Sequence, residues 1–245
     1  MKKLLFALPL LALAACEGSI ASAISDTGKS SFSDGETIGT SDVNPGDFEG
    51  VSLAGPDNVV FTSGSEFSIR AEGDEEVVEQ LRYKITNGQL KIGREKSGNW
   101  SIGKNSATVY VSAPSLKSAK LAGSGDMSVD EMDGEEAKVS IAGSGNITVS
   151  ALKTASLSTK IAGSGNANLS GDADNVSISI AGSGDVKGKS LNADSATIKI
   201  AGSGDVALSS EGAVDAKIVG SGDIRVHGNA TCTVKAAGSG KVTCS

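Results

Sequence analysis

A seven-residue motif that returns about every 20 residues is the feature that most constrains the fold of this chain. The sequence IAGSGDV occupies residues 180–186 and again residues 200–206, and close variants precede and follow it. The first glycines of successive motifs are separated by 20, 20, 19, 20, 18 and 18 residues. These glycines are Gly123, Gly143, Gly163, Gly182, Gly202, Gly220 and Gly238. Self-similarity on this scale is typical of stacked repeat architectures.

Apolar and polar residues alternate on both sides of each motif. The positions two and four residues before the first glycine are mostly Ile, Leu, Val or Ala, and so are those four and six residues after it. The intervening positions are mostly Ser, Thr, Lys, Asn or Asp. A period of two predicts strands with one buried face, and glycine permits the backbone angles of a sharp corner. We therefore predict two short strands in each unit, joined at Gly-Ser-Gly.

One such unit cannot bury its apolar face alone, whereas units stacked in register bury it against their neighbours. We predict an all-β fold, a right-handed parallel β-helix with coils of about 20 residues over residues 116–245; the hand follows the rule for parallel crossovers. Aromatic residues make up only 3% of the chain, so small and β-branched side chains must form the core. An antiparallel meander is the alternative, but hairpins do not require the same residue at every corner.

Residues 47–115 carry a different pattern, that of a mixed strand and short-helix region. The degenerate motif LAGPDNV at residues 53–59 suggests that the repeating unit also begins the domain. The pair Asn87-Gly88 lies between two alternating runs and predicts a hairpin. The segment DEEVVEQL, residues 74–81, predicts a helix capped by Asp74. We assign residues 47–245 to one head domain.

The first residues have the layout of a secretory signal, a short basic start followed by an apolar run that is too short to span a membrane. The sequence LAAC at residues 13–16 resembles a bacterial lipobox. That resemblance implies removal of residues 1–15, lipidation of Cys16 and a membrane partner through the lipid anchor. By analogy with sorting rules, Glu17 favours the outer membrane. An ordinary cleaved signal is the alternative.

The segment between the anchor and the head domain is rich in Ser, Gly, Thr and Asp. Residues 16–46 therefore predict a flexible tether, with an irregular first strand near Val43 as the alternative. Without residues 1–15 the chain has 20 basic and 29 acidic residues. This acidic balance argues against nucleic acid and against an anionic bilayer surface as partners, because both attract an excess of Lys and Arg.

The repeat offers two side-chain ladders that could carry chemistry. Asp or Asn follows most Gly-Ser-Gly corners, which suits either a calcium ladder or hydrogen bonding to corner N–H groups. The second interpretation is favoured because Asn146 and Asn166 interrupt the acids and Lys241 ends them. The corner serines lack a nucleophile elbow, and His227, the single histidine, follows inward-facing Val226 and should face solvent. We expect no catalytic residue, no metal and no cofactor.

Two cysteines remain once Cys16 is assigned to the lipid. Cys232 lies six residues before Gly238 and Cys244 lies six residues after it. Both therefore fall on the inward parity of the last coil, on opposite arms. In an oxidising compartment this predicts a disulfide that holds the terminal coil; two free buried thiols are the alternative.

The tandem AGSGD and AGSGN units, the mixed strand region before them and the lipoprotein-type start resemble one bacterial family, described as putative auto-transporter adhesin, head GIN domain. The resemblance covers about residues 47–245. It implies a right-handed β-helix in the cell envelope and assigns no catalytic residue. We expect a non-enzymatic, lipid-anchored envelope protein that acts in adhesion or binds polysaccharide or an envelope protein. A polysaccharide-active enzyme and a periplasmic assembly or sensor factor are the alternatives, and exposed terminal strands would permit a homo-oligomer.

Overall fold

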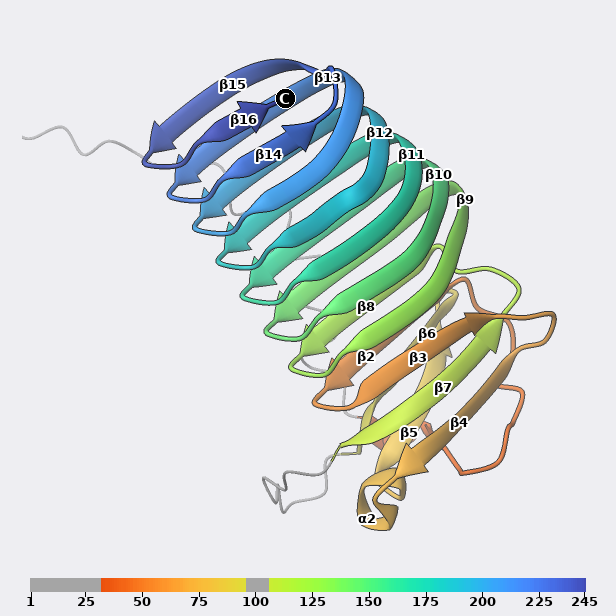
Figure 1. Ribbon diagram of the computed structural model, residues 1–245. Helices are drawn as coiled ribbons and strands as arrows, with labels where there is room; N and C mark the ends of the chain where they lie inside the picture. Colours follow the sequence, from red (N-terminus) through yellow and green to blue (C-terminus); the bar gives the residue numbers. More distant parts are fainter. Residues whose placement is uncertain (1–31, 96–105) are drawn as a thin grey trace, which may run out of the picture.

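The computed structural model describes residues 32–95 and 106–245 of the chain. These residues form a single sheet of 16 strands that is wound into a column of stacked coils (Figure 1). The predicted signal of residues 1–15 and the predicted lipidation site Cys16 lie outside the described residues.

Five long strands form the body of the column, and each pairs in parallel with the next. They are β9 (Met127–Gly143), β10 (Ile147–Gly163), β11 (Ala167–Gly182), β12 (Val186–Gly202) and β13 (Val206–Gly220). The motif residues stack in register, so that Ile141 lies beside Ile161, and Ile161 beside Ile180. The parallel β-helix is therefore confirmed, and the antiparallel meander is excluded for these coils.

Each coil differs from the prediction in one respect, because it holds one continuous strand rather than two short ones. The strand leaves one Gly-Ser-Gly corner, bends halfway and returns to the next corner, so each coil has a sharp edge and a rounded edge (Figure 1). Shifts in register lie at the rounded edge, for example between Val149 and Leu152. Units of 18 to 20 residues thus differ in length at the rounded edge while the corners stay aligned.

The core is built from the predicted inward positions. The residues two and four positions before each motif glycine, and four and six positions after it, are buried from the first motif through Val226. Ile161 and Val206 are fully inaccessible to solvent. In the last coil the equivalent positions are open to solvent, and Val234 is 48% exposed. The predicted parity is therefore confirmed, and burial ends where the stack ends.

The degenerate motif also forms a coil, as the sequence suggested. β2 (Gly50–Gly55) pairs with β8 (Ser118–Gly123), and β3 (Asn58–Ser63) pairs with the start of β9. On the other side of this coil lie β6 (Gln89–Arg94) and β7 (Ala107–Ala113), again in parallel. The coil that comes first in the sequence, formed by β2 and β3, therefore lies second along the column, with β6 and β7 outside it.

Antiparallel strands close this end of the column. β4 (Ser68–Gly73) pairs with β7, and β5 (Leu81–Thr86) pairs with both β6 and β1 (Glu36–Thr37). The predicted hairpin joins β5 to β6, with φ of 53° at Asn87 and 70° at Gly88. The predicted helix is present but short, since α2 (Glu75–Val78) has four residues; the Asp74 side chain accepts from the Glu76 N–H at 3.1 Å.

The folded part begins earlier than the sequence suggested. Residues 32–46 include the 3-10 turn η1 (Phe32–Asp34) and strand β1, and Val43 forms a β-bridge with Ile69. Ile38 is fully buried in the core. The boundary predicted at residue 46 is therefore too late, because apolar side chains in an otherwise polar segment dock on the cap; the alternative strand near Val43 describes this region better.

The opposite end is formed by short strands. β14 (Ile224–His227) pairs with β13 and β16 (Val242–Cys244), while β15 (Thr231–Gly238) pairs with β13. Within the described residues no further strand covers β15 or β16. No helix in residues 32–95 or 106–245 is long and apolar enough to cross a membrane.

Candidate binding surface

The sharp edge owes its shape to close contact between successive corners. The seven motif glycines all have positive φ, for example 127° at Gly143. A Cβ atom on Gly143 would collide with the carbonyl oxygen of Gly123 in the coil before it. That oxygen accepts hydrogen bonds from the N–H groups of Ser144 at 3.0 Å and Gly145 at 3.2 Å. Glycine is therefore required both for the backbone angle and for the approach.

The Asp and Asn side chains that follow the corners form a continuous hydrogen-bonded ladder. The Asp126 Oδ1 atom accepts from the Asn146 N–H at 2.9 Å, and the same pattern links Asp185 to Asp205 and Asp205 to Asp223. The ladder ends with the Lys241 N–H, which donates to Asp223 at 3.0 Å. One oxygen of each of these side chains thus already accepts a backbone hydrogen bond, which supports the corner-bonding interpretation.

The remaining candidates for chemistry are placed apart from one another. The corner serines are exposed at the tips of the sharp edge. His227 is half-buried at the end of β14 and lies beside Ser209 in the sheet, so it faces solvent less fully than predicted. Residues 32–95 and 106–245 hold no group of three or more His, Cys, Asp or Glu side chains that could bind a metal ion. The Ser209 hydroxyl donates to the Lys189 carbonyl at 2.9 Å rather than to the neighbouring His227.

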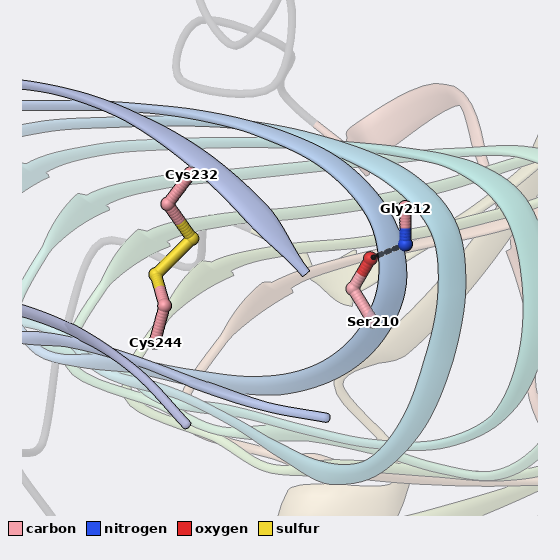
Figure 2. The surroundings of a disulfide bond; sticks show 4 residues. All are labelled: Ser210, Gly212, Cys232 and Cys244. Atoms are coloured by element: carbon pink, nitrogen blue, oxygen red, sulfur yellow. Dashed lines mark hydrogen bonds between the residues drawn. A yellow bond between two sulfur atoms is a disulfide. The ribbon is translucent and has the colours of Figure 1, made fainter. Parts of the chain in front are cut away.

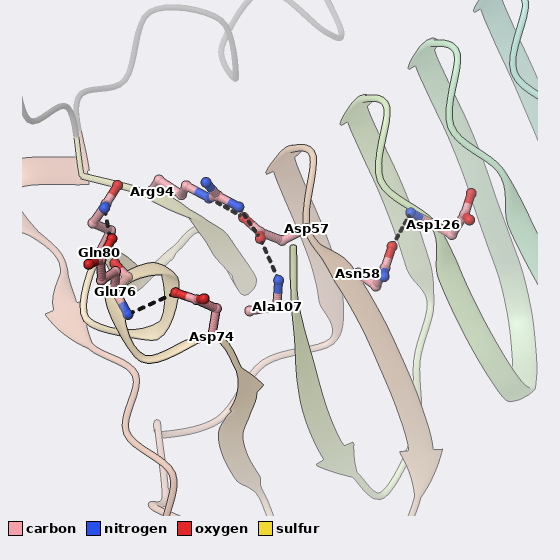
Figure 3. A network of polar contacts seen from close by, with 8 residues as sticks. All are labelled: Asp57, Asn58, Asp74, Glu76, Gln80, Arg94, Ala107 and Asp126. Atoms are coloured by element: carbon pink, nitrogen blue, oxygen red, sulfur yellow. Dashed lines mark hydrogen bonds and ion pairs between the residues drawn. The ribbon is translucent and has the colours of Figure 1, made fainter. Parts of the chain in front are cut away.

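A buried ion pair links the strands of the closed end, and it was not predicted from the sequence. Asp57 occupies the position of the second corner glycine and has no exposed surface. Its carboxylate accepts from Arg94 at 2.8 and 2.6 Å and from the Ala107 N–H at 2.9 Å (Figure 3). This bond raises the pKa of the Arg94 guanidinium further. The departure from Gly-Ser-Gly was visible in the sequence, but the partners lie 37 and 50 residues away.

The predicted disulfide joins Cys232 to Cys244, 12 residues apart. It crosses the last coil from β15 to β16 (Figure 2). Cys232 is half-buried and Cys244 is exposed, because no further coil covers them within the described residues. The disulfide thus joins the two arms of a coil whose inward side chains are less buried than those of the coils before it.

A shallow groove of about 500 Å³ lies beside the hairpin at the closed end. Its polar wall includes Lys117 and Lys138, which form ion pairs with Glu49 and Glu136, both at 2.7 Å. The hydrogen bond that Lys138 donates lowers the pKa of Glu136, and the one that Lys117 donates to Glu49 raises the pKa of Lys117. A lowered carboxyl pKa, as at Glu136, is the opposite of what a general acid needs.

The groove continues into a row of positions on the outer side of the returning half of each coil, all of them at least partly exposed except Ser52, which is buried. Strand pairing places one residue per strand, three positions before the motif glycine, side by side along this face. We call these residues the lysine row; in spatial order they are Lys91, Ser52, Lys120, Ser140, Lys160, Ser179, Lys199, Lys217 and Lys235. The alternation of apolar and polar residues marks these positions only as outward, although Lys recurs there at five of the seven motifs.

Comparison with known proteins places this architecture in a family. Residues 47–230 match the family described as "Putative auto-transporter adhesin, head GIN domain". The chain belongs to this family. The matched GIN domain includes the five long strands and ends before the disulfide-closed coil. The family description suggests an adhesin-like protein of the cell envelope or surface. No match was found among curated proteins.

Solved structures share the fold of the GIN domain. A "putative adhesin" from Bacteroides fragilis has a TM-score of 0.76 at 19% identity, over 83% of this chain and 95% of that chain. A "putative adhesin" from Parabacteroides merdae gives 0.66 at 23% identity, over 84% and 95%. A "putative lipid binding protein" from Parabacteroides distasonis gives 0.64 at 23%, over 86% and 98%. At these identities the likeness concerns the fold alone.

Proposed function

We propose that this GIN-domain protein is a non-enzymatic binding protein of the cell envelope, anchored by a lipid at Cys16 and acting in adhesion through contact with polysaccharide or an envelope partner. The observation that carries the proposal is the stacked surface. Every coil repeats the same outward positions in register with its neighbours. Such a surface offers many equivalent weak contacts, which together bind an extended partner firmly.

The rival function, cleavage of a polysaccharide, would need a cleft in which carboxylates of different pKa converge on one bond. The groove brings Glu49 and Glu136 near its lysines, but each carboxylate forms an ion pair with its own lysine. The lowered pKa of Glu136 favours the ionised form, so this group is a poor proton donor. The groove therefore supports binding better than catalysis.

The family description supports an adhesive role, and the names of the similar solved structures, two "putative adhesins" and one "putative lipid binding protein", support a surface-binding role of some kind. The lipid anchor rests on the sequence LAAC at residues 13–16. Labelling of the chain with a fatty-acid analogue in a bacterial host should modify the wild type and leave Cys16→Ser unmodified. Equal labelling of the two would contradict the anchor.

A paired assay tests the binding role. The full chain is applied to a glycan array, and the same glycans are then incubated with it and examined for new reducing ends or unsaturated products. The proposal predicts retention on a subset of glycans without product. Turnover at a rate well above a buffer control would establish the enzyme instead.

A further inference from the structure

The lysine row is unusual in a chain with a net charge of −7. The lysine row lies three positions before the motif glycine, and on the same face one flanking row lies one position before it and another lies five positions before it. The strands that contribute to these rows are β6, β2, β8, the returning halves of β9 to β13, and β15. These positions include seven lysines but one acid, Asp215. The lysines are Lys91, Lys120, Lys138, Lys160, Lys199, Lys217 and Lys235.

Acidic side chains lie elsewhere: four follow the corners in the ladder described above, and a larger group lies on the rounded edge. Exposed acids at that edge are Glu131, Asp133, Glu135, Glu136, Asp172, Asp174, Asp194 and Glu211. Lys153 also lies among these acids, but the acids outnumber it, so the column has a positive face and a mainly negative edge. The overall acidic balance, which argued against nucleic acid and an anionic bilayer surface as partners, therefore does not describe the field over this face.

The spacing of the row is regular. Adjacent coils lie about 4.8 Å apart, so Lys120, Lys160 and Lys199, which alternate with serines, lie about 9.6 Å apart. None of these three forms an ion pair with another described residue. The complete row from Lys91 to Lys235 extends over about 38 Å by the same spacing. A straight, evenly charged track of this kind fits a linear polyanion better than a compact ligand.

Lysines at the open end lie directly beside one another. Lys199 pairs with Lys217, and Lys217 pairs with Lys235. Like charges opposite each other in a sheet are destabilising, and the acid near them, Asp215, lies 3.4 Å from Lys217. An anionic ligand along the row would turn this repulsion into attraction.

Resting on the proposed binding role, we infer that the lysine row is a binding track for a linear acidic polysaccharide. Two sugar units of an extended chain span a length comparable to two coils, so that anionic groups meet successive lysines. The flanking row nearest the corners is mostly alanine, including Ala142, Ala162 and Ala181, which leaves the lysines accessible. A bilayer surface fits less well, because the two flanking rows add only one further lysine, Lys138, and the positive charge is therefore confined to a line rather than spread over a plane.

The test compares two triple variants of equal charge in the full chain carrying Cys16→Ser, so that no lipid contributes. Lys120→Ser, Lys160→Ser and Lys199→Ser together give the row the residue it already has at Ser140 and Ser179. The matched control is Lys153→Ser, Lys187→Ser and Lys189→Ser, three exposed lysines away from the row. Binding is measured to polygalacturonate, to neutral dextran and to phosphatidylcholine vesicles containing phosphatidylglycerol.

The inference predicts that polygalacturonate binds at low salt and that dextran does not. The row variant should bind at least about tenfold more weakly, whereas the control should change less than about twofold, and binding should weaken toward an ionic strength of about 0.15 M. Both variants should keep the wild-type melting curve, because the replaced side chains point outward. Ser140→Lys with Ser179→Lys should strengthen binding, and Ser128→Lys with Ser150→Lys on the opposite face should not.

Three results would overturn the inference: no binding of polygalacturonate, equal losses in both triple variants, or binding of the anionic vesicles alone. A different result would contradict the proposed binding function itself. If one of these three results is obtained while cells or other glycans still bind the wild type, the track is wrong and the binding role stands. If neither glycans nor cells bind the wild type, the binding role is wrong as well.

Discussion

The two ends of the column are closed by different means. At the first end, antiparallel strands and the buried pair of Asp57 and Arg94 cover the outermost coil. At the other end, the last coil is open within the described residues, and a disulfide joins its two arms. Every coil between them is stabilised by the same repeated contacts. A repeat therefore determines how coils stack, but each end needs a feature that does not repeat.

The largest expected effect concerns the closed end. Asp57→Ala would leave the Arg94 guanidinium and the Ala107 N–H without their buried acceptor, so we expect a loss of about 4 kcal/mol in the free energy of unfolding. Asp57→Asn keeps the shape and one acceptor and should lose about half as much. Urea denaturation measures both. A loss below about 1 kcal/mol for Asp57→Ala would mean that this pair does not fasten the end.

The next test compares the middle of the stack with its open end at equivalent core positions. Ile161→Ala should cost about 3 kcal/mol, because Ile161 is fully buried and the cavity cannot collapse between stacked coils. Val234→Ala should cost less than about 1 kcal/mol, since that side chain is 48% exposed. Thermal denaturation of the two variants gives the comparison. Equal losses would show that the last coil is covered.

Removal of the disulfide should have a smaller and more local effect. The bond closes a loop with a separation of 12 residues, for which the chain-entropy model gives at most about 3 kcal/mol. Cys232→Ser with Cys244→Ser should therefore raise amide exchange in residues 231–245, while β9 to β12 remain protected. If protection falls equally in the middle coils, the open end is part of one cooperative unit with the stack.

The smallest effect concerns pH at the closed end. Burial and the hydrogen bond to Glu36 raise the pKa of Tyr83 to about 12. Since this value lies above the ordinary one near 10, the stabilisation is complete below about pH 10 and is lost as pH rises toward 12. Stability should fall by up to about 2 kcal/mol over that window. Tyr83→Phe should flatten this part of the profile, and an unchanged profile would contradict the assignment.

The stack itself could be predicted from the sequence because the residues that determine it lie close together in the chain. Each inward position, such as Ile161 or Val186, is identified by its distance from a nearby glycine, and the repeat tests the assignment several times. The disulfide followed from the same parity. The rounded edge could not be predicted in this way, since no residue type recurs there, and one strand bends continuously where two were expected.

The ends of the column depend on contacts between residues far apart in the sequence. Asp57 meets Arg94 because β6 and β7 lie outside a coil that precedes them in the chain. Ile38 is buried by docking on the cap, although its neighbours are polar. The lysine row could have been predicted, because Lys120, Lys160 and Lys199 share one position relative to the motif. The alternation of apolar and polar residues alone, however, identifies that position only as outward.

The central claim is that equivalent residues of successive repeats lie side by side in a single stack. Spin labels on the exposed corner serines test it most directly by pairwise distance. With one label at Ser124 and the second at Ser183, Ser203 or Ser221, the stack predicts backbone separations that increase by one strand spacing at each step, about 14, 19 and 24 Å. Distances that alternate between short and long from one corner to the next would show antiparallel neighbours and would contradict this architecture.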